Sequence, residues 1–187
     1  VFDNISYKTV ISNGLVLDKN GNKMSKRLGN AVDPFETIEK YGSDPLRWYM
    51  ITNSSPWYNL KFDIEGVEEV RRKFFGTLYN TYSFFALYAN IDGFDASKYT
   101  LEYDKLPVMD KWLLSKLNSV VKAVDDHLGN YRIPEAARAL DSFVDEMSNW
   151  YVRRGRERFW AKGMEQDKIN AYMTLYTALV TVAKTAA

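Results

Sequence analysis

The sequence predicts a mainly α-helical chain in two parts, a small α/β segment over residues 1–62 and an antiparallel helix bundle over residues 63–187. Three observations support this prediction. Before residue 62, a short β-rich run is combined with polar turns. After residue 63, apolar residues recur at steps of three and four, which is the spacing of one helix face. Hydrophobic residues make up 46% of the chain and aromatic residues 15%, enough for a packed core.

The first part is predicted to contain a strand over residues 10–18. This run is rich in Val, Ile and Leu and leads into the polar turn 19–22. A polar, proline-containing connection over 52–59 precedes the bundle. Strands and helices do not alternate repeatedly, so the sequence does not predict a parallel nucleotide-binding sheet.

Two short helices are predicted after the turn. The first covers residues 34–41, because Asp33 can cap its N-terminus and Pro34 suits the first helical position. The second covers residues 45–52 and is predicted to open in the same way, with Asp44 before a proline.

Four longer helices with mostly short connections predict an antiparallel bundle. Their expected ranges are 63–91, 108–128, 134–162 and 168–187. Between the first two lies a loop, with an extended piece expected at 99–103. Residues assigned to the core of the first helix are Tyr79, Tyr82, Phe84, Phe85 and Tyr88. The second helix is expected to bury Leu113, Leu117, Val120, Val124 and Leu128, and the third to bury Leu140, Val144, Met147, Tyr151, Gly155 and Phe159. Gly155 on that stripe suggests close approach to a neighbouring helix.

The net charge and the cysteine content restrict the kinds of function that the chain can have. The formal net charge is only +1, so any affinity for nucleic acid must come from local patches. There are no cysteines, which excludes disulfides and thiolate zinc sites within this span. No apolar run is long enough to cross a bilayer and no signal-like start is visible, so we expect a cytoplasmic protein without a membrane partner. The start at Val1 and the end at Ala187, inside a helix-forming stretch, suggest a piece of a longer protein.

A short basic run is the most specific local feature. Lys23 and Lys26 lie between Gly21 and Gly29, which predicts a mobile loop suited to a polyphosphate. Taken alone, such a run is more often a solvated turn.

The helix expected over 134–162 ends in a second basic region. Residues 149–162 hold four arginines, one lysine and one glutamate. Trp150, Arg153, Arg156 and Trp160 fall opposite the apolar stripe, and an outward face of aromatic rings and guanidinium groups suits unstacked RNA bases and phosphates. The alternative is an amphipathic helix whose arginines pair with carboxylates. Those carboxylates are Asp141, Asp145, Glu146 and Glu157.

The order of these motifs resembles the signature region of class I aminoacyl-tRNA synthetases. Residues 23–27 match the family's KMSKS loop in four of five positions, with Arg27 in place of the final serine. The flanking runs 14–18 and 29–47 fit the same region. The runs 51–63 and 149–160 are closest to the isoleucine-specific members, with valine- or other branched-chain-specific members as the alternative. A different interpretation is a non-catalytic helical interaction domain in which the loop is a coincidence.

The resemblance implies roles for these residues. Residues 1–62 would be the end of a catalytic region, and residues 63–187 part of an anticodon-binding bundle. Lys23 and Lys26 would be catalytic. Together with Ser25 and Arg27, they would bind the phosphates of ATP, and Mg²⁺ would accompany the ATP. The predicted partners are ATP, isoleucine and tRNA(Ile), the last held by the outward tryptophans and arginines. We expect a monomer and no protein metal site in this span.

Histidine content limits what this chain can do alone. The family's catalytic site also needs a His-x-Gly-His element, and the single histidine here is His127. We therefore expect no aminoacylation by this chain in isolation.

Overall fold

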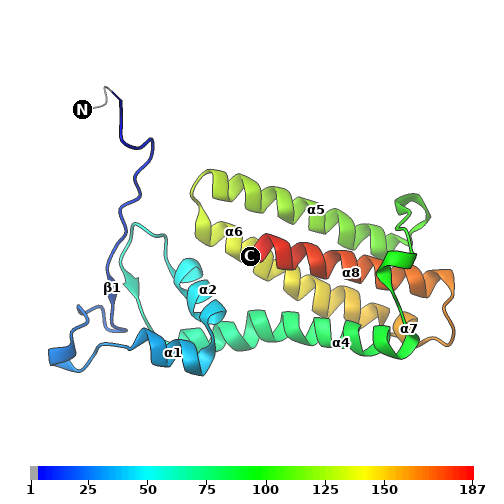
Figure 1. Ribbon diagram of the computed structural model, residues 1–187, viewed down its shortest axis with the longest axis horizontal. Helices are drawn as coiled ribbons and strands as arrows, with labels where there is room; N and C mark the ends of the chain where they lie inside the picture. The colour runs from blue at the N-terminus through cyan, green and yellow to red at the C-terminus, as the bar shows by residue number, and fades with distance from the viewer. Residues whose placement is uncertain (1–3) are drawn as a thin grey trace. The chain divides into compact units, whose positions relative to one another are not determined.

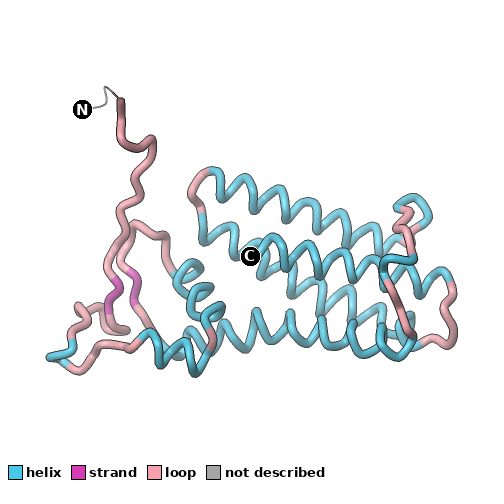
Figure 2. Tube along the Cα trace, viewed as in Figure 1, coloured by secondary structure: helices cyan, strands magenta, loops and turns pink. Residues whose placement is uncertain are grey.

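A computed structural model describes residues 4–187 of the chain. The chain divides into two compact units, Val1–Glu69 and Val70–Ala187. Helices dominate, and the two strands described both lie in the first unit (Figures 1 and 2). The predicted mainly α fold with a small α/β segment is confirmed. The predicted division at residue 62 stays a prediction, because a single helical stretch begins at Ile64 and continues past residue 70.

The sheet of the first unit is a short parallel pair. Strand β1 (Val16–Leu17) lies beside β2 (Leu60–Lys61), with Val16 opposite Leu60. The predicted strand over 10–18 is therefore too long, because only its end has a partner for its backbone hydrogen bonds. Just before β1, a Cβ atom on Gly14 would lie 2.2 Å from the carbonyl oxygen of Tyr58, so only glycine permits this approach of the two backbones.

Helix α1 (Pro34–Tyr41) begins where the sequence predicts. The Asp33 side chain accepts hydrogen bonds from the backbone N–H groups of Phe35 (2.8 Å) and Glu36 (3.2 Å). These two donors have no partner within the helix itself, so the carboxylate cap stabilises the first turn.

Helix α2 (Ser43–Asn53) begins earlier than predicted. Its N-cap is Gly42, with φ of 92° and no side-chain cap hydrogen bond. The expectation that Asp44 caps this helix is therefore wrong. Asp44 lies inside the first turn and forms an exposed ion pair with Arg47 at 3.8 Å.

Tyr49 ties the first unit together. Its buried hydroxyl donates to the carbonyl of Lys61 (3.1 Å) and accepts from the backbone N–H of Asp63 (3.1 Å). Its ring meets Phe62 edge-on, with centroids 5.6 Å apart. These contacts join α2 to β2 and to the start of α3 (Ile64–Val70). They therefore hold together the part of the first unit that carries the basic loop.

The first long helical stretch continues through a π-helical turn, η2 (Arg71–Phe75), into α4 (Gly76–Asp92). Two residues predicted for its core are exposed instead, Tyr79 at 67% and Tyr82 at 54%. Helix α4 is apolar on nearly all sides, so periodicity could not decide which face the other helices would cover.

The connection between α4 and α5 (Val108–Gly129) contains two 3₁₀ turns, Ala96–Lys98 and Tyr103–Lys105. Between these turns the backbone is extended at Tyr99 (φ −125°, ψ 149°) and at Glu102 (φ −100°, ψ 96°), as predicted for 99–103, but Tyr103 belongs to the second turn. Tyr99 stacks on Phe94, with ring centroids 5.5 Å apart and planes at 1°. Leu128, at the end of α5, is also exposed rather than buried.

The remaining helices complete an antiparallel arrangement within the second unit, in which successive long helices run in opposite directions (Figure 1). They are α6 (Ile133–Glu146), the π-helical turn η5 (Met147–Val152), α7 (Arg153–Trp160) and α8 (Gln166–Ala186).

The π-helical turn η5 keeps the predicted apolar stripe buried. From Leu140 to Phe159 the stripe spans five turns, about one residue more than five turns of α-helix at ~3.6 residues each. The π turn takes up that residue, and Met147, Tyr151 and Phe159 are all buried. A Cβ atom on Gly155 would meet only the ring of Phe159, at 4.0 Å, so the expected close approach of a neighbouring helix there is wrong.

The core of the second unit is aromatic and aliphatic. Its largest fully buried side chains include Tyr151, Tyr172, Phe143, Phe159, Leu113 and Met147. Within residues 4–187, no helix combines the length and the apolar character that a membrane span requires.

Candidate functional site

A carboxylate organises the turn that leads into the basic loop. Asp18, directly after β1, accepts hydrogen bonds at its side chain from the backbone N–H groups of Asn20 (2.9 Å) and Asn22 (2.8 Å). Its carbonyl accepts from the N–H of Gly21, where φ is +88°. The hydrogen bond from the Asn30 side chain, followed by that from the Asn22 backbone, holds the pKa of Asp18 below its usual value.

Asn30 joins the two ends of the loop. Its amide nitrogen donates to Asp18 Oδ2 (2.9 Å) and to the carbonyl of Lys23 (3.3 Å). Its amide oxygen accepts from the backbone N–H of Ser25 (2.9 Å). Lys23 also pairs with Leu17 in a short antiparallel backbone bridge. The segment that carries the lysines is therefore held at several backbone points.

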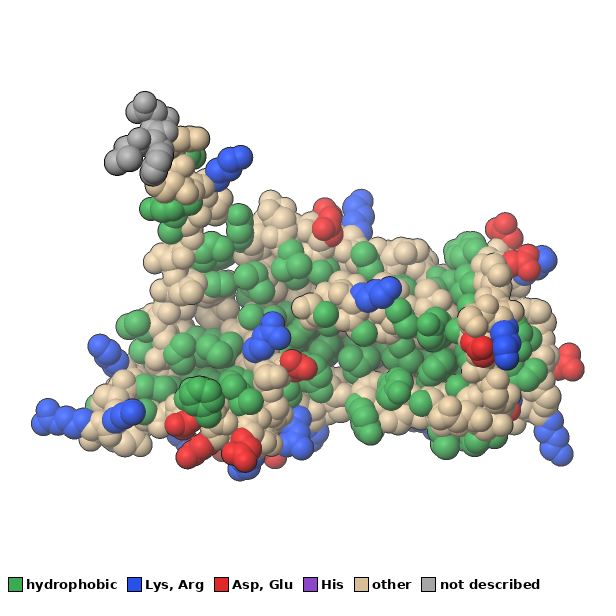
Figure 3. All heavy atoms as spheres, viewed as in Figure 1, with side chains coloured by type: hydrophobic (Ala, Val, Ile, Leu, Met, Phe, Trp, Pro, Cys, Tyr) green, Lys and Arg blue, Asp and Glu red, His purple; other side chains and the backbone are tan. Residues whose placement is uncertain are grey.

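The predicted phosphate-binding residues lie together in this loop. Lys23, Lys26 and Arg27 are exposed, and none of them forms an ion pair with any of residues 4–187. Blue Lys and Arg side chains project from the end of the first unit in Figure 3. Three open cations on a short loop can neutralise an anion that carries several negative charges.

Ser25 has a structural task in this loop. It is the N-cap of the 3₁₀ turn Lys26–Leu28, and its Oγ accepts a hydrogen bond from the N–H of Leu28 (3.2 Å). Gly29, with φ of +66°, ends that turn. The hydroxyl proton of Ser25 can still be donated to an anion, because the cap uses only the oxygen as an acceptor.

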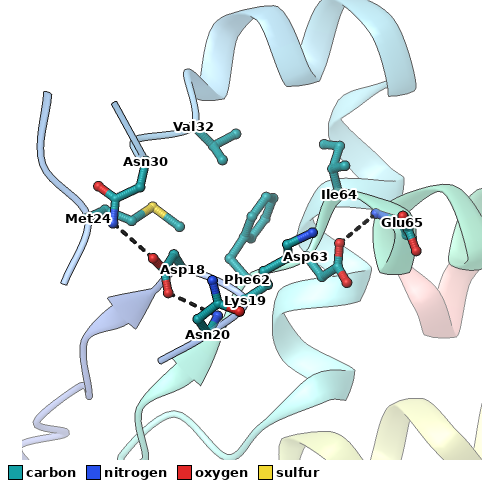
Figure 4. A pocket seen from close by; sticks show the side chains of 10 residues that line it. All are labelled: Asp18, Lys19, Asn20, Met24, Asn30, Val32, Phe62, Asp63, Ile64 and Glu65. Carbon is teal, nitrogen blue, oxygen red and sulfur yellow. Dashed lines mark hydrogen bonds between the residues drawn. The ribbon is translucent and has the colours of Figure 1, made fainter. Parts of the chain in front are cut away.

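A hollow of about 300 Å³ lies beside the loop (Figure 4). Met24 lines it together with Val32, Phe62 and Ile64. Met24 is half-buried there, unlike the exposed lysines on either side of it. Asp18, Asp63 and Glu65 also line the hollow, so its walls do not suit a phosphate.

In the second unit, η5 and α7 carry the residues predicted to contact RNA. Trp150 and Trp160 are 45% and 52% exposed, and Arg153 and Arg156 are exposed as well. Arg154, which was not predicted, places its guanidinium 3.7 Å from the ring centroid of Trp150. Such a stack holds a flat aromatic surface in place at the helix exterior.

A groove of about 270 Å³ brings two of these residues together. Arg153 and Arg156 line it, whereas Trp150 and Trp160 do not. The other lining residues come from α4 and from the helix 148–152: Asn80, Thr81, Phe84, Ser148, Asn149 and Val152. The groove combines two guanidinium groups with amide and hydroxyl groups, which is suitable for a phosphate and for polar base edges.

The fourth arginine of this region points into the protein. Arg158 forms a bidentate ion pair with fully buried Asp110, at 2.6 and 2.8 Å, and also bonds Asp167 at 2.8 Å. Tyr151 donates to the same Asp110 carboxylate at 2.7 Å. Burial opposes the charge of Arg158, but the hydrogen bonds to Asp110 and Asp167 outweigh it and raise its pKa. Burial, and then the charge of Asp110, raise the pKa of the Tyr151 phenol.

A second buried ion pair lies in the same unit. Lys168, which is buried, contacts Asp92 at 2.5 Å and donates to the carbonyl of Ala161 at 2.8 Å. Tyr172 donates to Asp92 at 2.5 Å. Burial would raise the pKa of Asp92, but the hydrogen bonds from Lys168 and Tyr172 hold it below its usual value.

Two of the carboxylates proposed as partners of the arginines in an amphipathic helix have other partners. Glu146 pairs with Lys116 at 3.1 Å, and Asp145 accepts a hydrogen bond from Asn149. Among residues 4–187, Arg153, Arg154 and Arg156 form no ion pair. That alternative is therefore wrong for the exterior arginines.

Several functional residues were missed from sequence. Asp18 and Asn30 were not predicted as site residues, although Asp-Lys-Asn-Gly-Asn is a pattern typical of a turn closed by an Asp side chain. Nothing in the helical spacing could show that Arg158 turns inward, because its partner Asp110 lies 48 residues away. Within the described chain, no group of three or more His, Cys, Asp or Glu side chains could hold a metal ion.

Both parts of the chain match protein families. Residues 1–63 match the family described as tRNA synthetases class I (I, L, M and V). Residues 110–187 match the anticodon-binding domain of tRNA ligase. The chain belongs to the class I aminoacyl-tRNA synthetases, as the motifs predict.

The similar curated proteins are named isoleucine–tRNA ligase. The chain is 69% identical to the Bacteroides fragilis protein over 185 residues, covering 98% of this chain and 16% of that protein. It is 68% identical to the Porphyromonas gingivalis protein over 180 residues, covering 96% of this chain and 16% of that one. The chain thus spans about a sixth of the length of these relatives, which supports the prediction that it corresponds to part of a synthetase.

Solved structures share the fold at low sequence identity. The methionyl-tRNA synthetase of Mycobacterium tuberculosis, bound by methionyl-adenylate, superposes with a TM-score of 0.70 at 18% identity, covering 93% of this chain and 34% of that one. The LeuRS of Agrobacterium radiobacter K84, in a ternary complex with tRNA and LeuAMS, gives 0.63 at 18% identity, covering 93% and 21%.

Proposed function

We propose that this chain supplies the ATP-closing loop and the tRNA-binding bundle of a synthetase that attaches isoleucine to tRNA(Ile) through an aminoacyl-adenylate. The observation that carries the proposal is the set of open cations at Lys23, Lys26 and Arg27, on a glycine-bounded loop that matches the class I family. The names of the relatives support the choice of isoleucine. By the same likeness, we propose a cytoplasmic, monomeric parent.

The loop acts on the first step of the reaction. The amino-acid carboxylate attacks the α-phosphate of ATP, a bond to that phosphorus forms, and pyrophosphate leaves. Negative charge grows on the phosphoryl oxygens and on the leaving group, so positioned cations lower the barrier. Lys23 and Lys26 neutralise this charge, Arg27 adds a third cation, and the Ser25 hydroxyl donates a hydrogen bond.

Magnesium would enter with the nucleotide. Mg²⁺ is commonly held by substrate phosphates with few protein ligands, so the phosphates of ATP would ligate it. The contribution of this chain is then limited to its own cations and hydrogen-bond donors.

The second unit contributes recognition of tRNA. In the groove, Arg153 and Arg156 would bind phosphate oxygens, which carry most of the affinity and make it salt-dependent. Trp150 and Trp160 offer exposed ring faces on which unstacked bases can stack.

The test of the catalytic role is Lys26→Ala in the full-length parent. Loss of one positioned charge should lower the rate of ATP–pyrophosphate exchange about 10²- to 10³-fold. Lys19→Ala, an exposed lysine of the same loop outside the basic run, is the matched control and should retain near-normal exchange. Unchanged exchange in Lys26→Ala would refute the catalytic assignment and favour a non-catalytic helical interaction domain.

The cognate amino acid requires a separate test. Binding of this chain to unmodified tRNA(Ile), with tRNA(Val) as competitor, should be salt-sensitive and should favour tRNA(Ile). Equal binding of both tRNAs would leave the isoleucine assignment resting on similarity alone, with a branched-chain relative as the alternative.

A further inference from the structure

We propose that Asn30 is a positioning residue whose side-chain amide holds the backbone from which Lys23 and Lys26 reach the phosphates. The proposal rests on the proposed function of the loop. It assigns a role to a residue outside the basic run, at the end of the loop that follows Gly29.

The position of Asn30 in the hydrogen-bond network is the first argument. One side chain contacts Asp18 at 2.9 Å, Ser25 at 2.9 Å and Lys23 at 3.3 Å, which lie 12, 5 and 7 residues earlier in the chain. Figure 4 shows the Asn30 amide directed at the Asp18 carboxylate. Asn30 therefore cross-links the start, the middle and the end of the loop.

The chemistry of the amide is the second argument. The Ser25 N–H needs an acceptor, whereas the Asp18 carboxylate and the Lys23 carbonyl need donors. A primary amide offers both an acceptor oxygen and two N–H donors, and only one orientation of the amide satisfies all three partners. A carboxylate at this position could not donate, and an alanine could do neither.

The location of the anchored atoms is the third argument. The two anchored backbone groups, the Lys23 carbonyl and the Ser25 N–H, lie on either side of Met24. Ser25 in turn caps the 3₁₀ turn that begins at Lys26. Release of the amide would therefore remove one backbone anchor on each side of Met24, while the bridge from Lys23 to Leu17 and the Asp18 turn would remain.

The consequence for catalysis follows from positioning. Lysine side chains are flexible, so a defined backbone is needed to keep two ammonium groups aimed at one polyphosphate. A misplacement of about 1 Å, from a change outside the reacting groups, can lower a rate by about 10²-fold. Asn30 touches no reacting atom and would act through the lysines.

The test is Asn30→Ala in the full-length parent, with Asn20→Ala as the matched control. Asn20 is an exposed asparagine of the same loop that takes part in this turn through its backbone N–H. Asn30→Ala should lower kcat/KM for ATP in ATP–pyrophosphate exchange by about 10- to 100-fold, with the thermal midpoint unchanged. Asn30→Asp, which keeps the acceptor but faces Asp18 with a second carboxylate, should not restore activity. Asn20→Ala should behave as the parent.

A double-mutant cycle separates positioning from a merely structural role. If Asn30 acts through the two lysines, Asn30→Ala should have at most a small further effect in a background that carries both Lys23→Ala and Lys26→Ala, because interacting residues are not additive. An equal loss in both backgrounds, or no loss in the parent background, would overturn the proposal. Normal exchange in Lys26→Ala itself would instead refute the proposed function.

A second measurement does not depend on activity. In this chain, hydrogen exchange at the Ser25 amide should be accelerated in Asn30→Ala, while the amides of Asn20 and Asn22 keep their protection. If Ser25 keeps its protection, the amide does not hold the loop and the proposal fails.

Discussion

The two basic regions of this chain present similar charges on different supports. In the loop, Lys23 and Lys26 project from a backbone held by half-buried polar side chains, Asp18 and Asn30. In the arginine-rich helix, Arg153 and Arg156 project from a helix whose inner face is locked by buried residues such as Tyr151 and Phe159.

This difference fits two kinds of task. Local opening costs little where few apolar contacts are buried, so a loop held mainly by polar hydrogen bonds can open and close around a small ligand. A helix anchored in the core keeps its cations at fixed spacing, as an extended polymer requires. Two clusters of positive charge are thus suited to gating in one region and to docking in the other.

The largest expected effect comes from breaking the internal support of the helix. Arg158→Ala would leave Asp110 charged, fully buried and without its ion-pair partner, which should lower the free energy of unfolding by about 3–5 kcal/mol. Urea denaturation of the chain measures this. Arg153→Ala is the matched control and should change stability by less than about 0.5 kcal/mol, because that side chain is exposed. Similar effects of both variants would contradict the division into an inner and an outer arginine.

Removing the outer cations should affect binding but not stability. The double substitution Arg153→Ala and Arg156→Ala should weaken tRNA binding and reduce the slope of log K against log salt by about 0.7 to 0.9 for each phosphate that is no longer neutralised. A salt series with labelled tRNA measures this. Lys122→Ala, on the exposed side of α5, should leave the slope unchanged. If the slope is the same in the double variant, the RNA surface lies elsewhere.

Backbone conformation gives a smaller effect that is specific to the loop. At Gly29 a Cβ atom would meet nothing within 4 Å, so Gly29→Ala isolates the cost of φ at +66°, about 1–2 kcal/mol for a residue with a side chain. Native-state hydrogen exchange at Leu28 should report this as easier local opening. Gly129→Ala, also with nothing within 4 Å but without a positive φ, should be neutral or slightly stabilising. Equal responses would show that the left-handed conformation does not limit the loop.

The smallest expected effect is a pH dependence confined to the loop. Because the pKa of Asp18 is lowered from 3.8, its hydrogen bonds stabilise the loop above pH 3.8 and are lost as the pH falls below 3.8. The side-chain amide resonance of Asn30 should report this titration by NMR. In Asn30→Ala, which lacks the largest cause of the shift, the Asp18 carboxyl should titrate closer to 3.8. The same titration in both proteins would exclude Asn30 as that cause.

Local rules explain which predictions succeeded. Helix α1 begins at its predicted residue because Asp33 and Pro34 act within one turn. The predicted strand over 10–18 was too long because a strand depends on its partner, and β2 lies more than 40 residues away in the sequence. Asp44 was predicted as a cap from the same pattern as Asp33, yet the chain enters α2 through Gly42 with a positive φ.

In the candidate site, too, some features follow from a single segment and others only from the folded chain. The sequence placed the three loop cations together and put Trp150, Arg153, Arg156 and Trp160 on an exposed side of the helix. It could not show that only Arg153 and Arg156 share a groove with α4, or that Arg154 covers Trp150. Those facts depend on the π-helical turn η5 and on which helix packs beside it.

Residue type and spacing along single segments were sufficient to predict the order of the helices, the basic loop and the apolar stripe, and the resemblance of the motifs indicated the family. Which cations remain open could be learned only from the folded chain. Arg158 and Lys168 form ion pairs with Asp110 and Asp92, whereas Lys23 and Lys26 form none with any of residues 4–187. This difference arises because a buried charge requires a partner, and a distant part of the chain supplies that partner.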